Sequence, residues 1–338
     1  MDILFPDRWF ELLAAKSVIW IFCLLIVSFF ALFKGSGWFV DGAAGAAKKL
    51  GIPAVIIGAT IVSLGTTSPE ATVSMMAAAA GKSSIALGNA IGSIICNTAL
   101  IFGLGCTLSN IPTDRFIFKR QGMVKLFSCM GFIALCYILL LFGSHYIARP
   151  FGFTLLGVLV WYIFISVKWS KQHRESGITD NEHIQAKKSL TALALIFLAG
   201  LILVIIASRV LIASATQICV KFGISEAVIA ATVVAFGTSV PELATGITSV
   251  IKGHKGILLG NIIGANILNI FIVIGGSVSI AGLQIQPVFY KLHFPFFVLI
   301  VGLFIIFSAV SKKYYSRIFG PVFLTIYTSY IIIQYVYG

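Results

Sequence analysis

The sequence predicts an all-α membrane protein with ten transmembrane helices, arranged as two inverted-topology five-helix repeats with helices broken at the midplane. Three observations lead to this fold class: an apolar composition, ten apolar stretches and an internal duplication. Of the 338 residues, 59% are apolar and only 10% are charged, whereas a soluble domain carries about 25% charged residues. Such a chain cannot cover a soluble surface with polar groups, which excludes a soluble enzyme and a nucleic-acid-binding protein.

Ten stretches have the length of about 20 mainly apolar residues that a helix needs to cross a bilayer. They are roughly 17–47, 53–80, 84–106, 123–143, 150–170, 189–220, 225–251, 256–277, 293–311 and 317–336. The polar stretch 171–188 separates the first five spans from the last five. The predicted organisation is therefore an N-terminal segment 1–16, a first repeat 17–170, a cytoplasmic linker 171–188 and a second repeat 189–338.

The basic residues predict how the spans are oriented. Counted over alternate loops, 16 Lys and Arg residues lie on one side and 6 on the other, and only Lys34 and Arg209 are expected inside spans. Because basic loops face the cytoplasm, both termini are expected to be extracytoplasmic, in a protein of the plasma membrane. The same rule accounts for the net charge of +13.

Residues 51–103 align without a gap to 223–275, at an offset of 172, and 20 of the 53 columns are identical. Apolar bias could match Ile with Val, but it does not place Pro-Glu and Gly-Asn at fixed positions. Since five spans, an odd number, separate equivalent points, the two copies should cross the membrane in opposite directions. Inverted repeats are typical of secondary transporters, whose binding site lies at the repeat interface near the midplane.

Three acidic residues are expected within spans: Asp41, Glu70 and Glu242. A carboxylate at the bilayer centre costs about 2.5–3.5 kcal/mol or more. Glu70 and Glu242 occupy equivalent positions and have no basic neighbour in sequence, so they predict a bound cation rather than a salt bridge. Asp41, near the cytoplasmic half of the first span, is interpreted as an entrance residue more than as an ion ligand.

The residues before each glutamate predict a broken helix. They read GTTSPE at 65–70 and GTSVPE at 237–242. A proline removes a backbone donor and clashes with the carbonyl four residues earlier. The carbonyls of residues 63–66 and 235–238 should therefore be free to act as oxygen ligands.

The spans that follow add side-chain oxygen, in GNAIGSIICN at 88–97 and GNIIGANILN at 260–269. Asn97 and Asn269 are predicted to line the site, and Ser93 shares a helix face with Asn97. Asn89 and Asn261 are interpreted as packing or capping groups. The glycines of these segments, Gly88, Gly92, Gly260 and Gly264, are interpreted as allowing close helix approach.

All these candidate ligands are hard oxygens. Ca²⁺ takes six to eight oxygens in flexible geometry, and Mg²⁺ prefers to keep its waters. The absence of His and Cys ligand patterns argues against transition metals. Two carboxylates balance one Ca²⁺, and the same oxygens can hold Na⁺. The predicted partners are therefore Ca²⁺, Na⁺ and the lipid bilayer, with no cofactor, nucleic acid or protein partner.

The paired motifs at these spacings resemble the α-repeats of sodium/calcium exchangers in the cation/calcium exchanger superfamily. The resemblance implies that Glu70, Glu242 and the backbone oxygens of Thr66 and Thr238 hold Ca²⁺. It implies flanking Na⁺ sites, one made by Ser63 carbonyl, Thr66, Ser93 and Glu242, the other by Ala235 carbonyl, Thr238 and Glu70. Asn97 and Asn269 would contact ions or water at the centre, and Thr67 and Ser239 are further candidates. It also implies that the first and sixth spans slide to alternate access.

Two positions depart from the family pattern. Ala265 stands where the family usually has Ser, and Asn269 stands where some relatives, including the potassium-dependent branch, have Asp. The leading prediction is an electrogenic Na⁺/Ca²⁺ antiporter, and the alternative is an H⁺/Ca²⁺ or other cation/Ca²⁺ antiporter of the same fold. Two hypotheses from other classes, a cation channel and a non-transporting membrane scaffold, are disfavoured by the inverted repeats with acids near the midplane.

Overall fold

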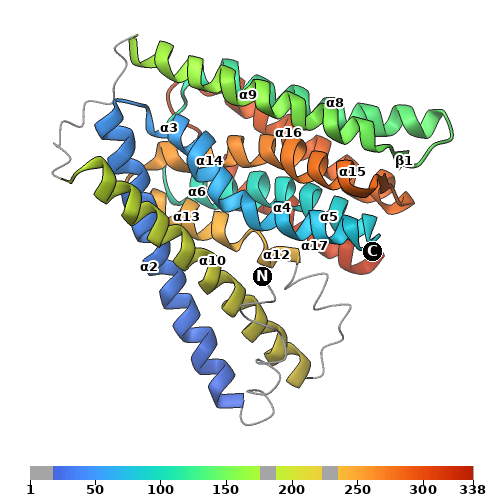
Figure 1. Cartoon of the computed structure of the whole chain (residues 1–338), viewed down its shortest axis with the longest axis horizontal. Coiled ribbons are helices and arrows are strands. Elements are labelled where there is room, and N and C mark those ends of the chain that lie inside the picture. Colours follow the sequence, from blue (N-terminus) through green and yellow to red (C-terminus); the bar gives the residue numbers. More distant parts are fainter. Residues whose placement is uncertain (1–17, 176–187, 223–234, 338) are drawn as a thin grey trace.

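The computed structural model describes residues 18–175, 188–222 and 235–337, which fold almost entirely into helices (Figure 1). The first repeat contains α2 (Val18–Leu50), α3 (Ala54–Ile57), η1 (Gly58–Val62), α4 (Ser63–Ala79), α5 (Ser83–Ile95), η2 (Cys96–Ile101), α6 (Phe102–Leu108), α7 (Arg115–Ile117), η3 (Phe118–Gly122), α8 (Met123–Leu141) and α9 (Arg149–Glu175). The second contains α10 (Leu190–Lys221), α12 (Ala235–Gly237), α13 (Val240–Ile251), α14 (Lys255–Leu268), η5 (Asn269–Ile274), α15 (Gly275–Ala281), η6 (Phe289–His293), α16 (Phe294–Val310) and α17 (Phe319–Tyr337). The η segments are π-helical turns within longer helices.

Within the described residues, eight helices are long and apolar enough to cross a membrane, which confirms a helical multi-pass membrane fold. The second predicted span is a continuous run of helix over 54–79, and of the seventh only 235–251 is described. The predicted N-terminal segment 1–16 and residues 176–187 of the predicted linker lie outside the described residues. The start of that linker is helical instead of loop, because α9 continues to Glu175.

The predicted break in the first copy is wrong, because α4 runs through Pro69 without interruption. Pro69 cannot donate to the Gly65 carbonyl, but the Ser68 hydroxyl donates to that carbonyl at 2.7 Å and replaces the missing bond. The equivalent of Ser68 in the second copy is Val240, whose side chain has no donor. There the helix breaks as predicted, with a turn at residues 238–239 between α12 and α13.

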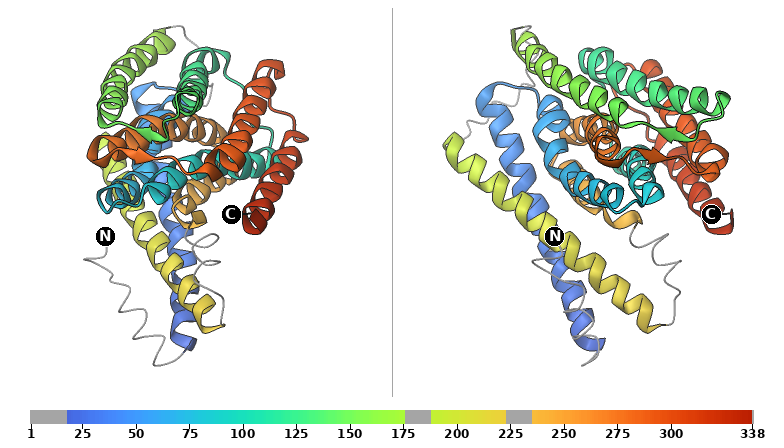
Figure 2. Two further views of the ribbon diagram at one scale, coloured as in Figure 1. Left: turned by 90° about the vertical axis from the view of Figure 1, so that its right-hand side faces the viewer. Right: turned by 45° about the vertical axis from the view of Figure 1, so that its right-hand side comes forward.

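The two longest helices, α2 and α10, pack on each other along most of their length and together cross the rest of the bundle obliquely (Figures 1 and 2). Glycines permit this close crossing. A Cβ atom on Gly200 would lie 2.3 Å from the backbone nitrogen of Phe39, and one on Gly42 would lie 2.6 Å from that of Phe197. The pair therefore forms a unit that is more tightly joined internally than to the other helices.

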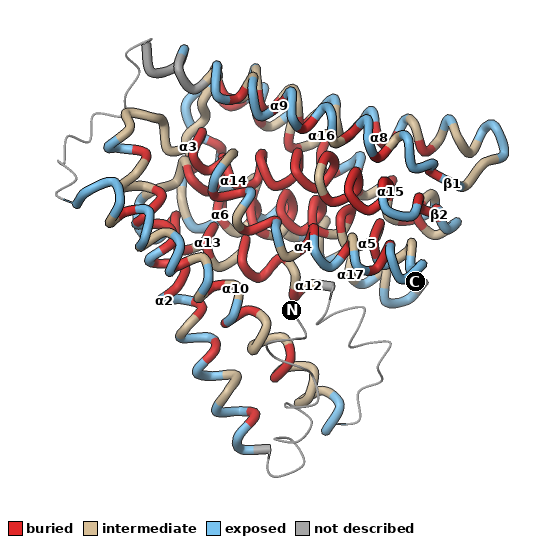
Figure 3. Tube along the Cα trace, viewed as in Figure 1, coloured by how far each residue is buried: buried red, intermediate tan, exposed pale blue. Residues whose placement is uncertain are grey.

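The core lies between the repeats, around α14, α5 and α15 (Figure 3). Every residue of α14 from Ile257 to Leu268 is buried. Loops of the two repeats also pair with each other: β1 (Tyr146–Ile147) is antiparallel to β2 (Leu283–Gln284), and Pro112 forms an isolated bridge with Tyr314. Both pairings join a loop of one repeat to a loop of the other.

The burial of Lys125 differs from the predicted distribution of charge. Lys125, at the cytoplasmic start of the predicted span 123–143, is one of the 16 basic residues assigned to the cytoplasmic side, but in the structure it lies inside α8 with 0% of its surface exposed. Its burial depends on side chains from other helices, which loop counting cannot anticipate. The number of basic residues in loops on the predicted cytoplasmic side falls from 16 to 15, which still exceeds the 6 on the other side.

Candidate functional site

Two buried glutamates, one from each repeat, form the centre of the candidate site. Glu70 lies in the middle of α4 and Glu242 in the first turn of α13, with 0% and 2% of their surfaces exposed. Their carboxyl groups interact with each other, and the Thr66 hydroxyl lies beside Glu242. Within the described part of the chain, neither glutamate forms an ion pair with a basic side chain. The structure thus brings the two duplicated acids together.

All four carboxylate oxygens of Glu70 and Glu242 are buried without a hydrogen-bond donor from the described residues. Burying an ionised carboxylate without a partner costs several kcal/mol even after the protein relaxes. Two such groups side by side repel each other as well. Their arrangement therefore favours a cation between them, which would supply the missing partner for both.

The break before Glu242 gives this residue a further source of stabilisation. Pro241 occupies the start of α13, so Glu242 lies at the helix N-terminus, where unpaired N–H groups carry partial positive charge. Glu70 has no such environment because α4 is continuous. The two glutamates are thus equivalent in sequence but differ in their local electrostatics.

Two hydrogen bonds cross between the repeats beside the glutamates and are related by the internal duplication. The Thr66 hydroxyl donates to Asn261 Oδ1 at 3.3 Å, and the Thr238 hydroxyl donates to Asn89 Oδ1 at 2.9 Å. The Asn89 amide also donates to the Glu70 carbonyl at 3.1 Å. Asn89 and Asn261, which the sequence suggested were packing groups, therefore position the site threonines. Their identity in both copies was the signal that could have revealed this role.

The remaining hydroxyl candidates lie on the same helices. The Ser239 hydroxyl donates to Ser93 Oγ at 3.3 Å across the repeat interface, and Thr67 Oγ1 is buried without a partner in the described residues. The Ser63 hydroxyl is turned to the Thr60 carbonyl, at 3.0 Å. Ala235 is the first residue of α12, one turn before the break.

Asn97 and Asn269 lie at equivalent points where α-helix gives way to π-helix. Asn97 is the second residue of η2 and Asn269 the first of η5, and each is 1% exposed. Both polar atoms of the Asn97 amide lack partners among the described residues, and so does Asn269 Oδ1. The Asn269 amide nitrogen donates to the Ala265 carbonyl at 3.0 Å, so its oxygen is left as a potential ligand. Single π-helical turns within α-helices are frequent at functional sites.

Close packing of α14 on α3 and η1 supports this arrangement. A Cβ atom on Gly260 would lie 2.0 Å from the Val55 carbonyl oxygen, and one on Gly264 would lie 2.3 Å from that of Ala59. The predicted close approach is confirmed for these two glycines. The residues equivalent to Val55 and Ala59 in the other copy fall in 223–234, outside the described residues, so the packing of Gly88 and Gly92 stays a prediction.

Asp41 has a partner of its own, away from the glutamates. Its Oδ2 lies 2.7 Å from Lys252 Nζ, and the same ammonium donates to the Gly37 carbonyl at 3.1 Å. One turn earlier, the hydroxyls of Ser36 and Thr248 are hydrogen-bonded at 2.7 Å. These contacts fasten α2 to the end of α13. They explain Asp41 without an ion.

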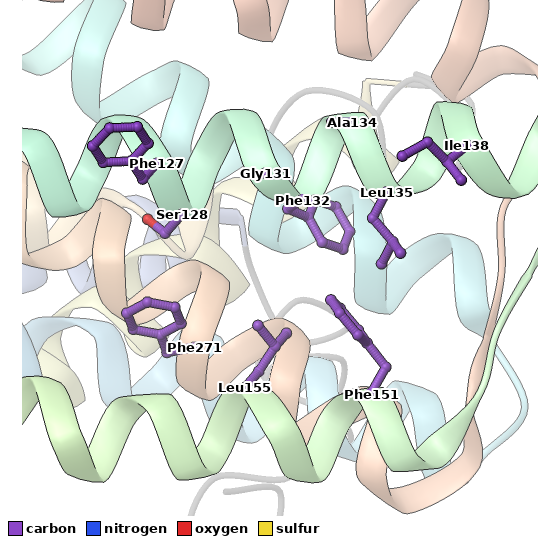
Figure 4. A pocket seen from close by; sticks show the side chains of 10 residues that line it. All are labelled: Phe127, Ser128, Gly131, Phe132, Ala134, Leu135, Ile138, Phe151, Leu155 and Phe271. Carbon is purple, nitrogen blue, oxygen red and sulfur yellow. The ribbon is translucent and has the colours of Figure 1, made fainter.

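An apolar cavity of about 400 Å³ lies elsewhere, between α8 and α9 (Figure 4). Its walls are almost entirely hydrocarbon, contributed among others by Phe127, Leu135, Phe151 and Phe271. Ser128 is the single hydroxyl-bearing residue among its lining side chains. A wall of this kind cannot replace the hydration shell of an ion, so the cavity is not the ion site.

The buried carboxylates, threonine hydroxyls and amide oxygens form a set of hard oxygen donors at the interface of two repeats. Such a set suits Ca²⁺ or Na⁺. Together with the multi-pass helical fold and the internal duplication, it defines the chain as a membrane ion transporter of the secondary class.

Comparison with known proteins gives the family. The family model described as "Sodium/calcium exchanger protein" matches residues 20–168 and 192–336. The chain belongs to the sodium/calcium exchanger family, and is therefore a transmembrane ion antiporter rather than a catalytic enzyme.

Individual relatives agree with this assignment. The chain is 34% identical to the putative antiporter CaxA of Alkalimonas amylolytica, over 76% of this chain and 80% of that protein. It is 28% identical to the sodium/calcium exchanger MaX1 of Methanosarcina acetivorans, over 93% and 98%. Among solved structures, it is similar to the sodium-calcium exchanger NCX_Mj, with a TM-score of 0.79, 28% identity and coverage of 94% of this chain and 99% of that chain.

Proposed function

We propose that this protein exchanges Na⁺ for Ca²⁺ across the membrane by alternating access, with the ions bound at the repeat interface. The observation that carries the proposal is the pair of buried glutamates, one from each repeat, whose four oxygens have no donor from the described residues. A cation that binds between the two carboxylates balances both of their charges, and another cation can replace it after it leaves. Competition between Ca²⁺ and Na⁺ for the same oxygens then couples their movements.

In this proposal Glu70 and Glu242, with the backbone oxygens of Thr66 and Thr238, bind Ca²⁺. The flanking Na⁺ sites use two sets of oxygens: those of Ser63, Thr66, Ser93 and Glu242, and those of Ala235, Thr238 and Glu70. Asn97 and Asn269 contact ions or water at the centre, and the hydroxyls of Thr67 and Ser239 lie within the same set. The hydrogen bonds Thr66–Asn261 and Thr238–Asn89 support these roles, because they hold the threonines beside the glutamates.

The flux of ⁴⁵Ca²⁺ into vesicles tests the function. Vesicles that contain the protein and are loaded with Na⁺ are expected to accumulate ⁴⁵Ca²⁺ when diluted into Na⁺-free medium, since Na⁺ leaving the vesicle drives Ca²⁺ inward. Protein-free vesicles and vesicles with equal Na⁺ on both sides are the controls. Uptake that is indifferent to the Na⁺ gradient would contradict the proposed coupling.

A second candidate, H⁺/Ca²⁺ exchange, is favoured by one observation. Ala265 provides no hydroxyl and its carbonyl is already bonded to Asn269, so this corner of the site offers fewer oxygens to Na⁺. Protons can replace Na⁺ on closely spaced carboxylates. In the same vesicles, uptake driven by a pH gradient in the absence of Na⁺ would decide for this candidate.

We also propose that the protein resides in the plasma membrane with both termini extracytoplasmic, as two five-helix units of residues 17–170 and 189–338 joined by a cytoplasmic linker at 171–188. The excess of basic residues in alternate loops supports this orientation. Labelling of single cysteines with a membrane-impermeant reagent in intact cells should modify a cysteine placed after Gly338. It should leave one placed at Lys171 unmodified.

The contacts that fasten α2 to α13 give a prediction about alternating access. If α2 moves along α13 during transport, the ion pair between Asp41 and Lys252 must break. Because both side chains are partly exposed, at 52% and 34%, the pair should contribute at most about 1 kcal/mol. Asp41→Asn is therefore expected to lower the population in which α2 contacts the end of α13, relative to the population in which it does not, by up to about fivefold.

Spin labels on the cytoplasmic ends of α2 and α13 report this shift as a longer interlabel distance, measured by double electron–electron resonance spectroscopy. Lys34→Met is the matched control, since Lys34 lies on the same helix and its ammonium faces Trp38, 5.8 Å from the ring centre. An unchanged distance distribution in Asp41→Asn would show that the ion pair does not bias the position of α2.

A further inference from the structure

Lys125 is a charged side chain that the proposed ion site does not use, although it lies deep inside the protein. It is fully buried in α8, the eleventh residue of the span Arg115–Leu141. Its ammonium lies 3.3 Å from Thr98 Oγ1, to which it donates, and 3.6 Å from the centre of the Phe304 ring. An ionisable residue inside a membrane span is expensive to bury and usually serves a function.

The partner of Lys125 belongs to the wall of the ion site. Thr98 follows Asn97 in η2, and its hydroxyl also accepts a hydrogen bond of 2.6 Å from the Asn266 amide. Asn266 in turn follows Ala265 in α14. Lys125 is thus held immediately behind two helices that line the site, one from each repeat.

Within the described residues, no ion pair joins Lys125 to a carboxylate. A hydroxyl oxygen and an aromatic face stabilise the charge locally, but they do not neutralise it. Among the described acidic residues, Glu70 and Glu242 belong to the same candidate site as Asn97, which precedes the Lys125 partner Thr98 in the chain.

The internal duplication shows that this feature belongs to one repeat alone. Lys125 lies beyond the ungapped repeat, but α8 and α16 are equivalent helices, and the third residue of α8 corresponds to the third residue of α16, Phe296, which is apolar and is followed by the buried Phe297. The second repeat therefore forms the equivalent helix without a buried ammonium at this position. The lysine is therefore an addition to the shared architecture.

We propose that Lys125 is a specificity-determining residue of the ion site, whose ammonium, where charged, weakens the binding of divalent cations more than the binding of monovalent cations. This inference rests on the proposed binding of cations between Glu70 and Glu242. Coulomb repulsion scales with the charge of the bound ion, so any change in affinity for Na⁺ is squared for Ca²⁺. For a separation on the order of 10 Å and an effective dielectric constant of about 20, the factors are roughly tenfold and roughly hundredfold.

Equilibrium binding of ⁴⁵Ca²⁺, and its displacement by Na⁺, tests this proposal on the purified full-length protein. Lys125→Met removes the charge, Lys125→Gln removes it while keeping an amide that can bond Thr98, and Lys125→Arg keeps it. Both neutral variants are expected to bind Ca²⁺ roughly a hundredfold more tightly and each Na⁺ roughly tenfold more tightly than the unchanged protein. Lys125→Arg should stay within about twofold for both ions.

The ratio of the two logarithmic shifts separates electrostatics from structure. A value near two supports the proposal, whereas equal shifts, weaker binding of both ions, or an Arg variant that behaves like the neutral ones would overturn it. If one neutral variant fails to fold, the other still gives the ratio. If the unchanged protein binds no Ca²⁺, it is the proposed function that fails, and that result is distinguishable from an absent Lys125 effect.

Discussion

Glu70→Gln and Glu242→Gln are each expected to abolish Na⁺-driven ⁴⁵Ca²⁺ uptake and to weaken Ca²⁺ binding by on the order of a thousandfold or more. Each substitution removes one of the two buried charges that a divalent cation would balance, while it keeps the size of the side chain. Without Ca²⁺, both variants should be at least as stable to heat as the unchanged protein, because a buried carboxylate without a donor opposes folding.

This combination distinguishes a lost ligand from a misfolded protein, since misfolding would lower both binding and stability. Asp114→Asn is a suitable control for replacing an acid. Asp114 caps α7 by accepting hydrogen bonds from the backbone of Phe116 and Ile117, far along the chain from the glutamates, and its loss should leave Ca²⁺ exchange intact. Exchange that persists in either glutamine variant would contradict the assignment of that glutamate.

Gly264→Ala is expected to weaken Ca²⁺ binding at least about tenfold and to destabilise the protein by about 1–3 kcal/mol or more. The added methyl group would lie 2.3 Å from the Ala59 carbonyl oxygen and 2.5 Å from Ser63 Oγ. Because a backbone carbonyl cannot swing away as a side chain can, α14 must separate from η1. That separation also moves Asn261 away from Thr66, which it now holds at 3.3 Å.

Gly157→Ala is the matched control, because Gly157 lies on the exposed face of α9 and an added Cβ meets nothing there within 4 Å. Calcium binding and the melting temperature, measured in the same detergent, check both variants. Equal behaviour of Gly264→Ala and Gly157→Ala would mean that the tight crossing of α14 over η1 is not needed for the site.

The sequence predicted those parts of the molecule that depend on composition and on the duplication. Spans, repeats and the equivalence of Glu70 and Glu242 all follow from patterns within the chain. The identical Pro69 and Pro241 also predicted two equivalent breaks, of which the structure has one. The difference arises from the residue before each proline, since Ser68 can replace the lost donor and Val240 cannot.

Features that depend on contacts between distant segments were not predictable in this way. Lys125 sits near a predicted span end, and its burial depends on Thr98 and Phe304, 27 and 179 residues away. The π-helical turns that begin near Asn97 and Asn269 have no signature in the local sequence. The pairing of Asp41 with Lys252 likewise joins residues 211 positions apart.

Direct location of a bound metal tests the central proposal most sharply. Anomalous diffraction from crystals of the protein grown with Sr²⁺ in place of Ca²⁺ should show one strong peak, within ligand distance of both the Glu70 and the Glu242 carboxylates and absent when Na⁺ is in large excess. A peak that touches only one of the two glutamates, or that lies away from the contact between the repeats, would contradict it.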